Sequence, residues 1–174
     1  MNLLPKHMGH SASEYDMQDE VAELMFKLSF SITRSERPWF IDIHPKVYRE
    51  VTISEIGRRS DIIVQVTPRK IFNIECKISD CRGVLKQAID HLKWADYSYI
   101  CIHDKAYIPD DVIREMLDKG IGLLMWEKGM LMESFGSRHN KGKDKLIRES
   151  VMRTLKKKDS EIEAKKHIQT EIAL

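Results

Sequence analysis

The chain has 174 residues, of which 42% are hydrophobic and 32% charged, with 8 glycines and 5 prolines. This length predicts one domain with room for a short extension, and the composition excludes a disordered chain, a collagen-like chain and a disulfide-rich peptide. The net charge of +2 is unevenly distributed, because residues 138–167 hold 11 lysines or arginines against 5 acidic residues.

The sequence also bears on location. No segment approaches the roughly 20 consecutive apolar residues of a membrane-spanning helix, and residues 1–16 lack the apolar stretch of a secretion signal. Three cysteines at uneven spacing favour reduced thiols. We therefore expect a cytoplasmic protein without a membrane partner.

The first half of the chain is typical of one helix followed by a run of strands. Residues 14–29 carry apolar side chains at helical spacing, and Ser13 is a suitable N-cap. Alternation and β-branched content predict four strands, at 39–43, 47–53, 61–66 and 71–77. Residues 67–70, with proline second, predict a turn that joins the last two strands as a hairpin.

The second half of the chain alternates between helix and strand. The predicted elements are helices at 84–95 and between Pro109 and Gly120, a buried strand at 98–103, a hairpin of 121–127 with 130–135, and a helix within 143–170. This order predicts an α/β domain around one mixed sheet over residues 1–136. A basic helical extension follows over residues 137–174.

Asp61, Glu75 and Lys77 have the clearest chemical meaning. Alternate residues of a strand share a face, so Glu75 and Lys77 project together while Cys76 faces the core. The hairpin brings Asp61 beside that pair. Two carboxylates with a lysine suit Mg²⁺-assisted hydrolysis, because hard oxygen ligands hold the ion and an ammonium group stabilises phosphate charge or orients a water. An ordinary ion pair beside a turn contains the same residue types, and the short apolar strands around the three residues favour the functional interpretation.

Other kinds of site are not indicated. Cys76 and Cys81 lack the spacing of a zinc site and Cys101 lies in a predicted buried strand, so we expect the cysteines to be small core residues. The sequence contains no phosphate-binding P-loop, no dinucleotide fingerprint and no nucleophile elbow.

An Asp followed by Glu-x-Lys on the adjacent strand resembles the signature of the PD-(D/E)xK, or restriction-endonuclease-like, nuclease superfamily, over roughly residues 14–103. The resemblance implies a mixed sheet flanked by helices in the order α-β-β-β-α-β, followed here by a hairpin and a helical tail. It implies Mg²⁺, for which Mn²⁺ can substitute, bound by Asp61, Glu75 and the carbonyl of Cys76. Lys77 would position or activate the attacking water. Ser60 stands where the family often has proline.

Many members of this superfamily add residues from the two helices. On the helical wheel Glu20 flanks the apolar stripe of the first helix, so we expect it as a further metal ligand, or else as a solvated glutamate at the core edge. Gln87 is expected near the metal or the phosphate backbone. His91, on the same helical face, is expected near the nucleic acid or as a histidine at the core edge.

These residues predict a Mg²⁺-dependent endonuclease that hydrolyses DNA phosphodiester bonds, with structure-selective cutting favoured and with a role in repair, recombination or restriction. The alternative is a non-catalytic DNA-binding module of the same fold, which would hold phosphates through Arg58, Arg59 and the basic tail; a solvated loop is an equal interpretation of the two arginines. A third interpretation is an assembly factor whose terminal helix docks on a partner. Cutting both strands commonly needs two active sites, which is compatible with a homodimer.

Overall fold

The computed structural model describes residues 13–36, 45–67 and 69–172, and the predicted strand at 39–43 lies outside them. The elements are α1 (Glu14–Glu36), β1 (Lys46–Ile53), the short 3₁₀ helix η1 (Ser54–Ile56), β2 (Arg58–Thr67), β3 (Lys70–Lys77), α2 (Cys81–His91), β4 (Tyr97–His103), α3 (Asp110–Lys119), β5 (Gly122–Glu127), β6 (Met130–Phe135) and α4 (Lys145–Ile172). The predicted α/β class with one mixed sheet is confirmed.

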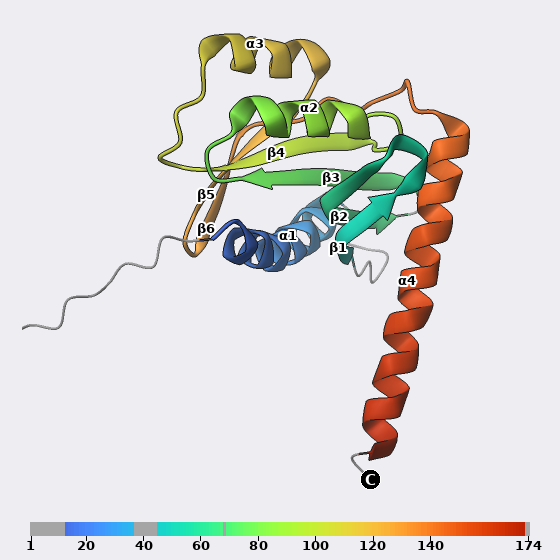
Figure 1. Cartoon of the computed structure of the whole chain (residues 1–174). Coiled ribbons are helices and arrows are strands. Elements are labelled where there is room, and N and C mark those ends of the chain that lie inside the picture. The colour runs from blue at the N-terminus through green and yellow to red at the C-terminus, as the bar shows by residue number, and fades with distance from the viewer. Residues whose placement is uncertain (1–12, 37–44, 68, 173–174) are drawn as a thin grey trace, which may run out of the picture.

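The six strands lie side by side in chain order. β1, β2 and β3 are antiparallel, β3, β4 and β5 are parallel, and β6 closes an antiparallel hairpin. Each parallel step needs a crossover, and α2 and α3 supply these crossovers on one face of the sheet, while α1 lies across the other face (Figure 1). The carboxyl ends of β3, β4 and β5 therefore meet at one edge, which is where sheets of this kind place their ligand sites.

The apolar side chains form a core on each face of the sheet. On the α1 face, Met17 and Val21 pack with Ile74 and Cys76. On the α2 face, Val84 and other residues of α2 and α3 pack on β4 and β5. All three cysteines are buried and unpaired, as predicted. The sheet thus separates the α1 face, which carries Cys76, from the α2 face, which carries Glu75.

Local signals place most of the helix ends. The Ser13 hydroxyl accepts the Asp16 N–H at 3.1 Å, which confirms the predicted cap of α1. α2 begins at Cys81, three residues before the predicted start, because the Asp80 side chain accepts the Gly83 N–H at 2.9 Å; it ends at His91, before the predicted residue 95. Gly120 closes α3 with a φ of 75°, the left-handed conformation that favours glycine.

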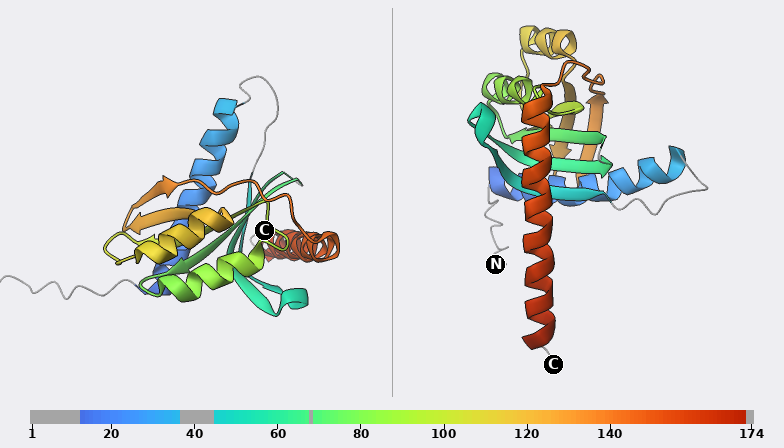
Figure 2. Two further views of the ribbon diagram at one scale, coloured as in Figure 1. Left: turned by 90° about the horizontal axis from the view of Figure 1, so that it is seen from above. Right: turned by 90° about the vertical axis from the view of Figure 1, so that its right-hand side faces the viewer.

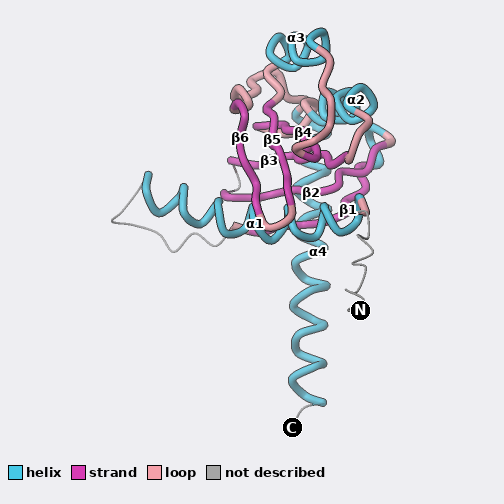
Figure 3. Tube along the Cα trace, turned by 90° about the vertical axis from the view of Figure 1, so that its left-hand side faces the viewer, coloured by secondary structure: helices cyan, strands magenta, loops and turns pink. Residues whose placement is uncertain are grey.

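α4 has a base packed on the domain and a distal half that projects from it (Figures 2 and 3). Val151 and Leu155 are buried in a third cluster with Tyr48 and Trp94. The expected extension beyond residue 136 therefore contributes to the core of the domain. Within the part of the chain that the structure describes, no helix has the length and apolar character needed to cross a bilayer.

Candidate active site at the carboxyl end of β3

Asp61 lies where β2 separates from β3. The pairing of the two strands runs up to Ile62 opposite Ile74. One residue further along β2, the Asp61 carboxylate accepts the backbone N–H of Cys76, with 2.9 Å between Oδ2 and the nitrogen. The side chain replaces a strand-to-strand hydrogen bond, and Asp61 is held against the segment that carries Glu75 and Lys77.

A bend in β1 accompanies this separation. Glu50, which lies between the pairs Arg49–Ile62 and Val51–Ser60 and so faces Asp61, has a φ of 49°. A positive φ is uncommon for a residue other than glycine and is found preferentially at functional sites. The bend changes which residues of β1 are buried: Tyr48 is buried before Glu50, and Val51 and Ile53 are buried after it. The regular alternation of buried and exposed residues expected over 47–53 is therefore wrong before Glu50.

The Asp61 carboxyl group is in a place that disfavours its charge. Burial, followed by the negative charge of Glu75, raises its pKa from 3.8 to about 6, although the Cys76 N–H and the Lys77 ammonium act in the opposite direction. The negative charge of Glu14 also contributes to raising the pKa of Asp61. The structure therefore brings the predicted Asp61, Glu75 and Lys77 into one electrostatic neighbourhood.

Glu75 is completely buried, with 0% of its surface exposed. Neither carboxylate oxygen has a hydrogen-bond partner among the described residues. The imidazole of His91 lies beside this carboxylate, with Nε2 3.2 Å from Oε1 but not aligned for a hydrogen bond. A buried carboxylate without partners is costly, so the fold maintains this residue at the expense of stability.

Lys77 is held by an acid from the first helix. Its Nζ lies 2.5 Å from Oε1 of Glu14, and this bond is the largest of the causes that raise the pKa of the ammonium group. Lys77 therefore stays cationic at neutral pH. As a cation it can donate a hydrogen bond or stabilise negative charge, and it cannot accept a proton.

The first-helix acid at the site is thus Glu14, and the prediction of Glu20 is wrong. The Glu20 carboxylate accepts hydrogen bonds from Trp126 Nε1 at 3.1 Å and from the backbone N–H of Gly129, which places it on the β5–β6 hairpin. The helical wheel identified the correct acid for a core edge, but it contains no information on which turn of the helix crosses which strand. The presence of Glu14 in the first turn was the only available signal.

His91 and Gln87 come from α2, on the face of the sheet that carries Glu75. His91 is fully buried, so the expectation that it contacts nucleic acid is wrong. Gln87 lies one turn before His91 on the same helical face and is half-buried. It remains a candidate for contact with a ligand or phosphate.

Arg58 and Arg59 flank the site through ion pairs. Arg58 Nε lies 2.8 Å from Asp90 Oδ2 on α2, and Arg59 Nη1 lies 3.2 Å from Glu50 Oε1 on β1. Both arginines keep partly exposed side chains. Their phosphate-binding role stays a prediction.

The residues present fit a hard divalent cation. Asp61 and Glu75 offer carboxylate oxygens and Cys76 offers a backbone carbonyl, and no described residue donates a hydrogen bond to either oxygen of Glu75. Among the described residues no three histidine, cysteine or acidic side chains gather as metal ligands. Mg²⁺ does not need such a cluster, because it usually takes one or two carboxylates and retains several waters.

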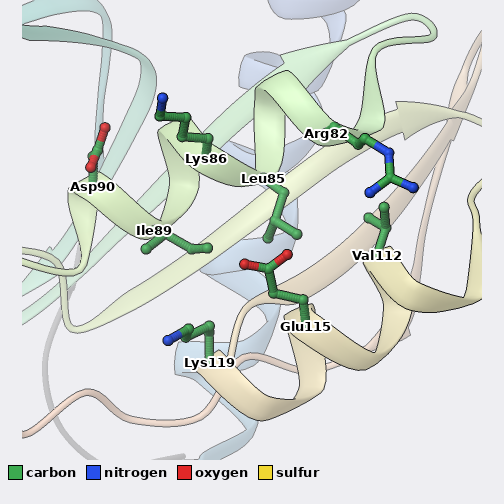
Figure 4. A pocket seen from close by; sticks show the side chains of 8 residues that line it. All are labelled: Arg82, Leu85, Lys86, Ile89, Asp90, Val112, Glu115 and Lys119. Atoms are coloured by element: carbon green, nitrogen blue, oxygen red, sulfur yellow. The ribbon is translucent and has the colours of Figure 1, made fainter.

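A groove between α2 and α3 is separate from this site. Its volume is about 400 Å³, and Leu85, Ile89 and Val112 form its apolar part beneath Lys86, Glu115 and other charged side chains (Figure 4). Neither His91 nor Glu75 is among the residues that line it. The groove therefore provides no access to Glu75.

Comparison with known proteins finds no matching family model and no matching curated protein. Among solved structures, the chain is similar to SPO1766 of Silicibacter pomeroyi, a protein of unknown function, with 18% identity and a TM-score of 0.49 over 67% of this chain and 75% of that one. It is also similar to SfsA of Pyrococcus furiosus, solved in complex with Ca²⁺, with 14% identity and a TM-score of 0.40 over 71% of this chain and 64% of that one. Neither similarity identifies a site residue or an activity of this chain.

Proposed function

We propose that this chain is a metal-dependent nuclease with a restriction-endonuclease-like core that hydrolyses DNA phosphodiester bonds. The observation that carries the proposal is the meeting of Asp61, Glu75 and Lys77 at the end of β3, with Glu75 buried and without a hydrogen-bond partner in the described part of the chain. The order α1, β1, β2, β3, α2, β4 also agrees with the core that this superfamily implies.

In the proposed site, Asp61, Glu75 and the carbonyl of Cys76 would hold Mg²⁺ or Mn²⁺. The chemistry that such a cation would supply is stabilisation of charge on the phosphate and a lowered pKa of a bound water. Lys77, kept cationic by Glu14, donates to the attacking water or to a phosphate oxygen and stabilises the negative charge that develops. Hydrolysis adds water across one P–O bond and leaves a phosphate monoester and a free hydroxyl group.

The test is cleavage of supercoiled plasmid, linear duplex, single strand and four-way junction in Mg²⁺, Mn²⁺ or EDTA. We compare the wild type with Glu75→Gln, Lys77→Met and the control Lys105→Met, whose lysine is exposed on another loop. Cutting should require metal, fall by about a hundredfold or more in the two site variants, and persist in the control. Cutting in EDTA, or undiminished cutting by Glu75→Gln, contradicts the proposal.

A second candidate is a DNA-binding module of the same fold without catalysis. It is favoured by the complete burial of Glu75 and by the pairing of Lys77 with Glu14, which together leave little of the triad available to a substrate. In that case no substrate is cut, and wild type and site variants retard DNA equally in a gel. Arg58→Ala and Arg59→Ala should then weaken binding and reduce its salt dependence.

A further inference from the structure

His91 is held in one orientation by a neighbouring indole. Its Nδ1 accepts the Nε1–H of Trp94 at 2.9 Å, and the two rings meet edge to face with centroids 5.5 Å apart. Both side chains are completely buried. An indole N–H is only a donor, so Nδ1 carries no proton and the proton of the imidazole is on Nε2.

The protonated nitrogen faces Glu75. Nε2 lies 3.2 Å from Oε1, and no hydrogen bond from any other described residue reaches either oxygen of that carboxylate. A neutral imidazole N–H orients a carboxylate without cancelling its charge, whereas a lysine or arginine at this place would compete with a cation. Once aligned, that N–H would occupy Oε1 and leave Oε2 as the free acceptor.

The support for Trp94 comes from the far end of the chain. The backbone carbonyl of Trp94 accepts a hydrogen bond from Arg148 of α4, and the same guanidinium group binds the buried Asp96 at 2.6 Å. The segment that carries Trp94 is therefore anchored between α2, β4 and α4, so the indole is a rigid donor.

We propose that His91 is a positioning residue that orients the Glu75 carboxylate as a ligand of the divalent cation, with Trp94 selecting its tautomer; the inference rests on the proposed function. Partners of this kind behind a metal ligand commonly change metal affinity by about 10–100-fold when removed. His91 Nε2 and Glu75 Oε1 are not aligned for a hydrogen bond in this structure, and bonds of this kind often tighten when a ligand binds.

The experiment measures Mn²⁺ binding to the full chain without DNA by electron paramagnetic resonance. His91→Phe keeps a ring against Trp94 and removes the donor, so affinity should fall about 10–100-fold. His91→Gln places an amide N–H near the position of Nε2 and should restore affinity to within a fewfold of wild type. A merely structural role predicts that Gln is no better than Phe, or that both variants differ in melting temperature and not in affinity.

The ¹⁵N shifts of His91 in labelled wild-type protein give a second readout that needs no variant. They should report the Nε2–H tautomer, and Trp94→Phe should weaken that preference. An Nδ1–H tautomer in the wild type, or unchanged Mn²⁺ affinity in His91→Phe, overturns the inference alone. A wild type that binds no Mn²⁺ overturns the proposed function and this inference together, so the two failures are distinguishable.

Discussion

Asp61 combines a hydrogen bond that fixes it with surroundings that oppose its charge. Its oxygen satisfies the Cys76 N–H, while burial and Glu75 raise its pKa to about 6. A raised carboxyl pKa means that the folded state holds the proton more tightly than the unfolded state does. The stabilisation by that proton is fully present below about pH 4 and is lost as the pH rises through about 6.

This linkage predicts that Asp61→Asn stabilises the metal-free protein at pH 8. Asparagine keeps an acceptor for the Cys76 N–H and removes the charge, so the free energy of unfolding should rise by about 2–3 kcal/mol at pH 8. The gain should shrink as the pH falls and vanish below about pH 3, where the carboxyl group is protonated in both states. Urea unfolding in EDTA at the two pH values measures it, and a destabilised variant at pH 8 would contradict the assignment.

Glu14 and Glu20 belong to the same helix, but we expect opposite phenotypes when each is replaced by glutamine. Glu14→Gln removes the acid that holds Lys77 in place, so cleavage should fall about 10–100-fold, as for other partners that orient a site residue, with little change in melting temperature. Glu20→Gln should cut like the wild type and melt earlier, because Trp126 and Gly129 lose a charged acceptor. Loss of cutting in Glu20→Gln with normal cutting in Glu14→Gln would restore the original prediction.

The start of β5 lies very close to the Tyr99 ring of β4. A Cβ atom at Gly122 would overlap the Tyr99 ring and stand 2.7 Å from the Ser137 nitrogen. A Cβ atom at Gly57 would have no neighbour within 4 Å, but the backbone there has a φ of +60°, which disfavours a residue with a side chain. The two glycines are therefore needed for different reasons, one for a close approach and one for a backbone conformation.

The contrast predicts unequal costs for two alanine substitutions. Gly57→Ala should lower the free energy of unfolding by about 1 kcal/mol, the cost of a left-handed conformation for a residue with a side chain. Gly122→Ala should cost about 3 kcal/mol or more, because backbone and a packed ring must move. Chemical denaturation of both variants measures the difference. Equal losses in the free energy of unfolding would contradict the prediction and show that the Tyr99 ring moves aside at little cost.

At the scale of the whole molecule, α4 joins the domain at the edge opposite the triad. Its base contacts Asp96, which precedes β4, and Tyr48 of β1, whereas Lys77 ends β3 at the other edge. β3 spans its full length between them, roughly 25 Å at the usual rise per residue. The basic tail therefore starts far from Asp61, Glu75 and Lys77, so a role of the tail in holding DNA would be separate from the chemistry proposed for these three residues.

Two truncations test how much of α4 the fold needs. A chain ending at Gly136 loses Val151 and Leu155 from the core and the ion pair of Arg148 with the buried Asp96, so it should lose cooperative unfolding. A chain ending at Glu163 retains all three and should melt within a few degrees of the full chain. A stable, cooperative chain ending at Gly136 would restore the predicted boundary between domain and extension. Circular dichroism melts distinguish the outcomes.

Local physics accounts for what the sequence predicted well. Periodicity placed the helices and strands, Ser13 and Gly120 marked helix ends, and alternation along β3 put Glu75 and Lys77 on the face away from Cys76. The hairpin between β2 and β3 brought Asp61 beside them, because a short turn determines which residues face each other. All of these features depend on residues within a few positions of one another or across one turn.

Three features of the site depended on tertiary structure. Glu14 reaches Lys77 instead of Glu20 because of where α1 crosses the sheet, His91 is buried against Glu75 because of how α2 lies on β3, and Arg148 supports Trp94 because α4 returns to the domain. Each contact joins residues far apart in the chain. A helical wheel gives the direction of a side chain around its axis, whereas the position of the axis over the sheet results from the packing of all the cores together.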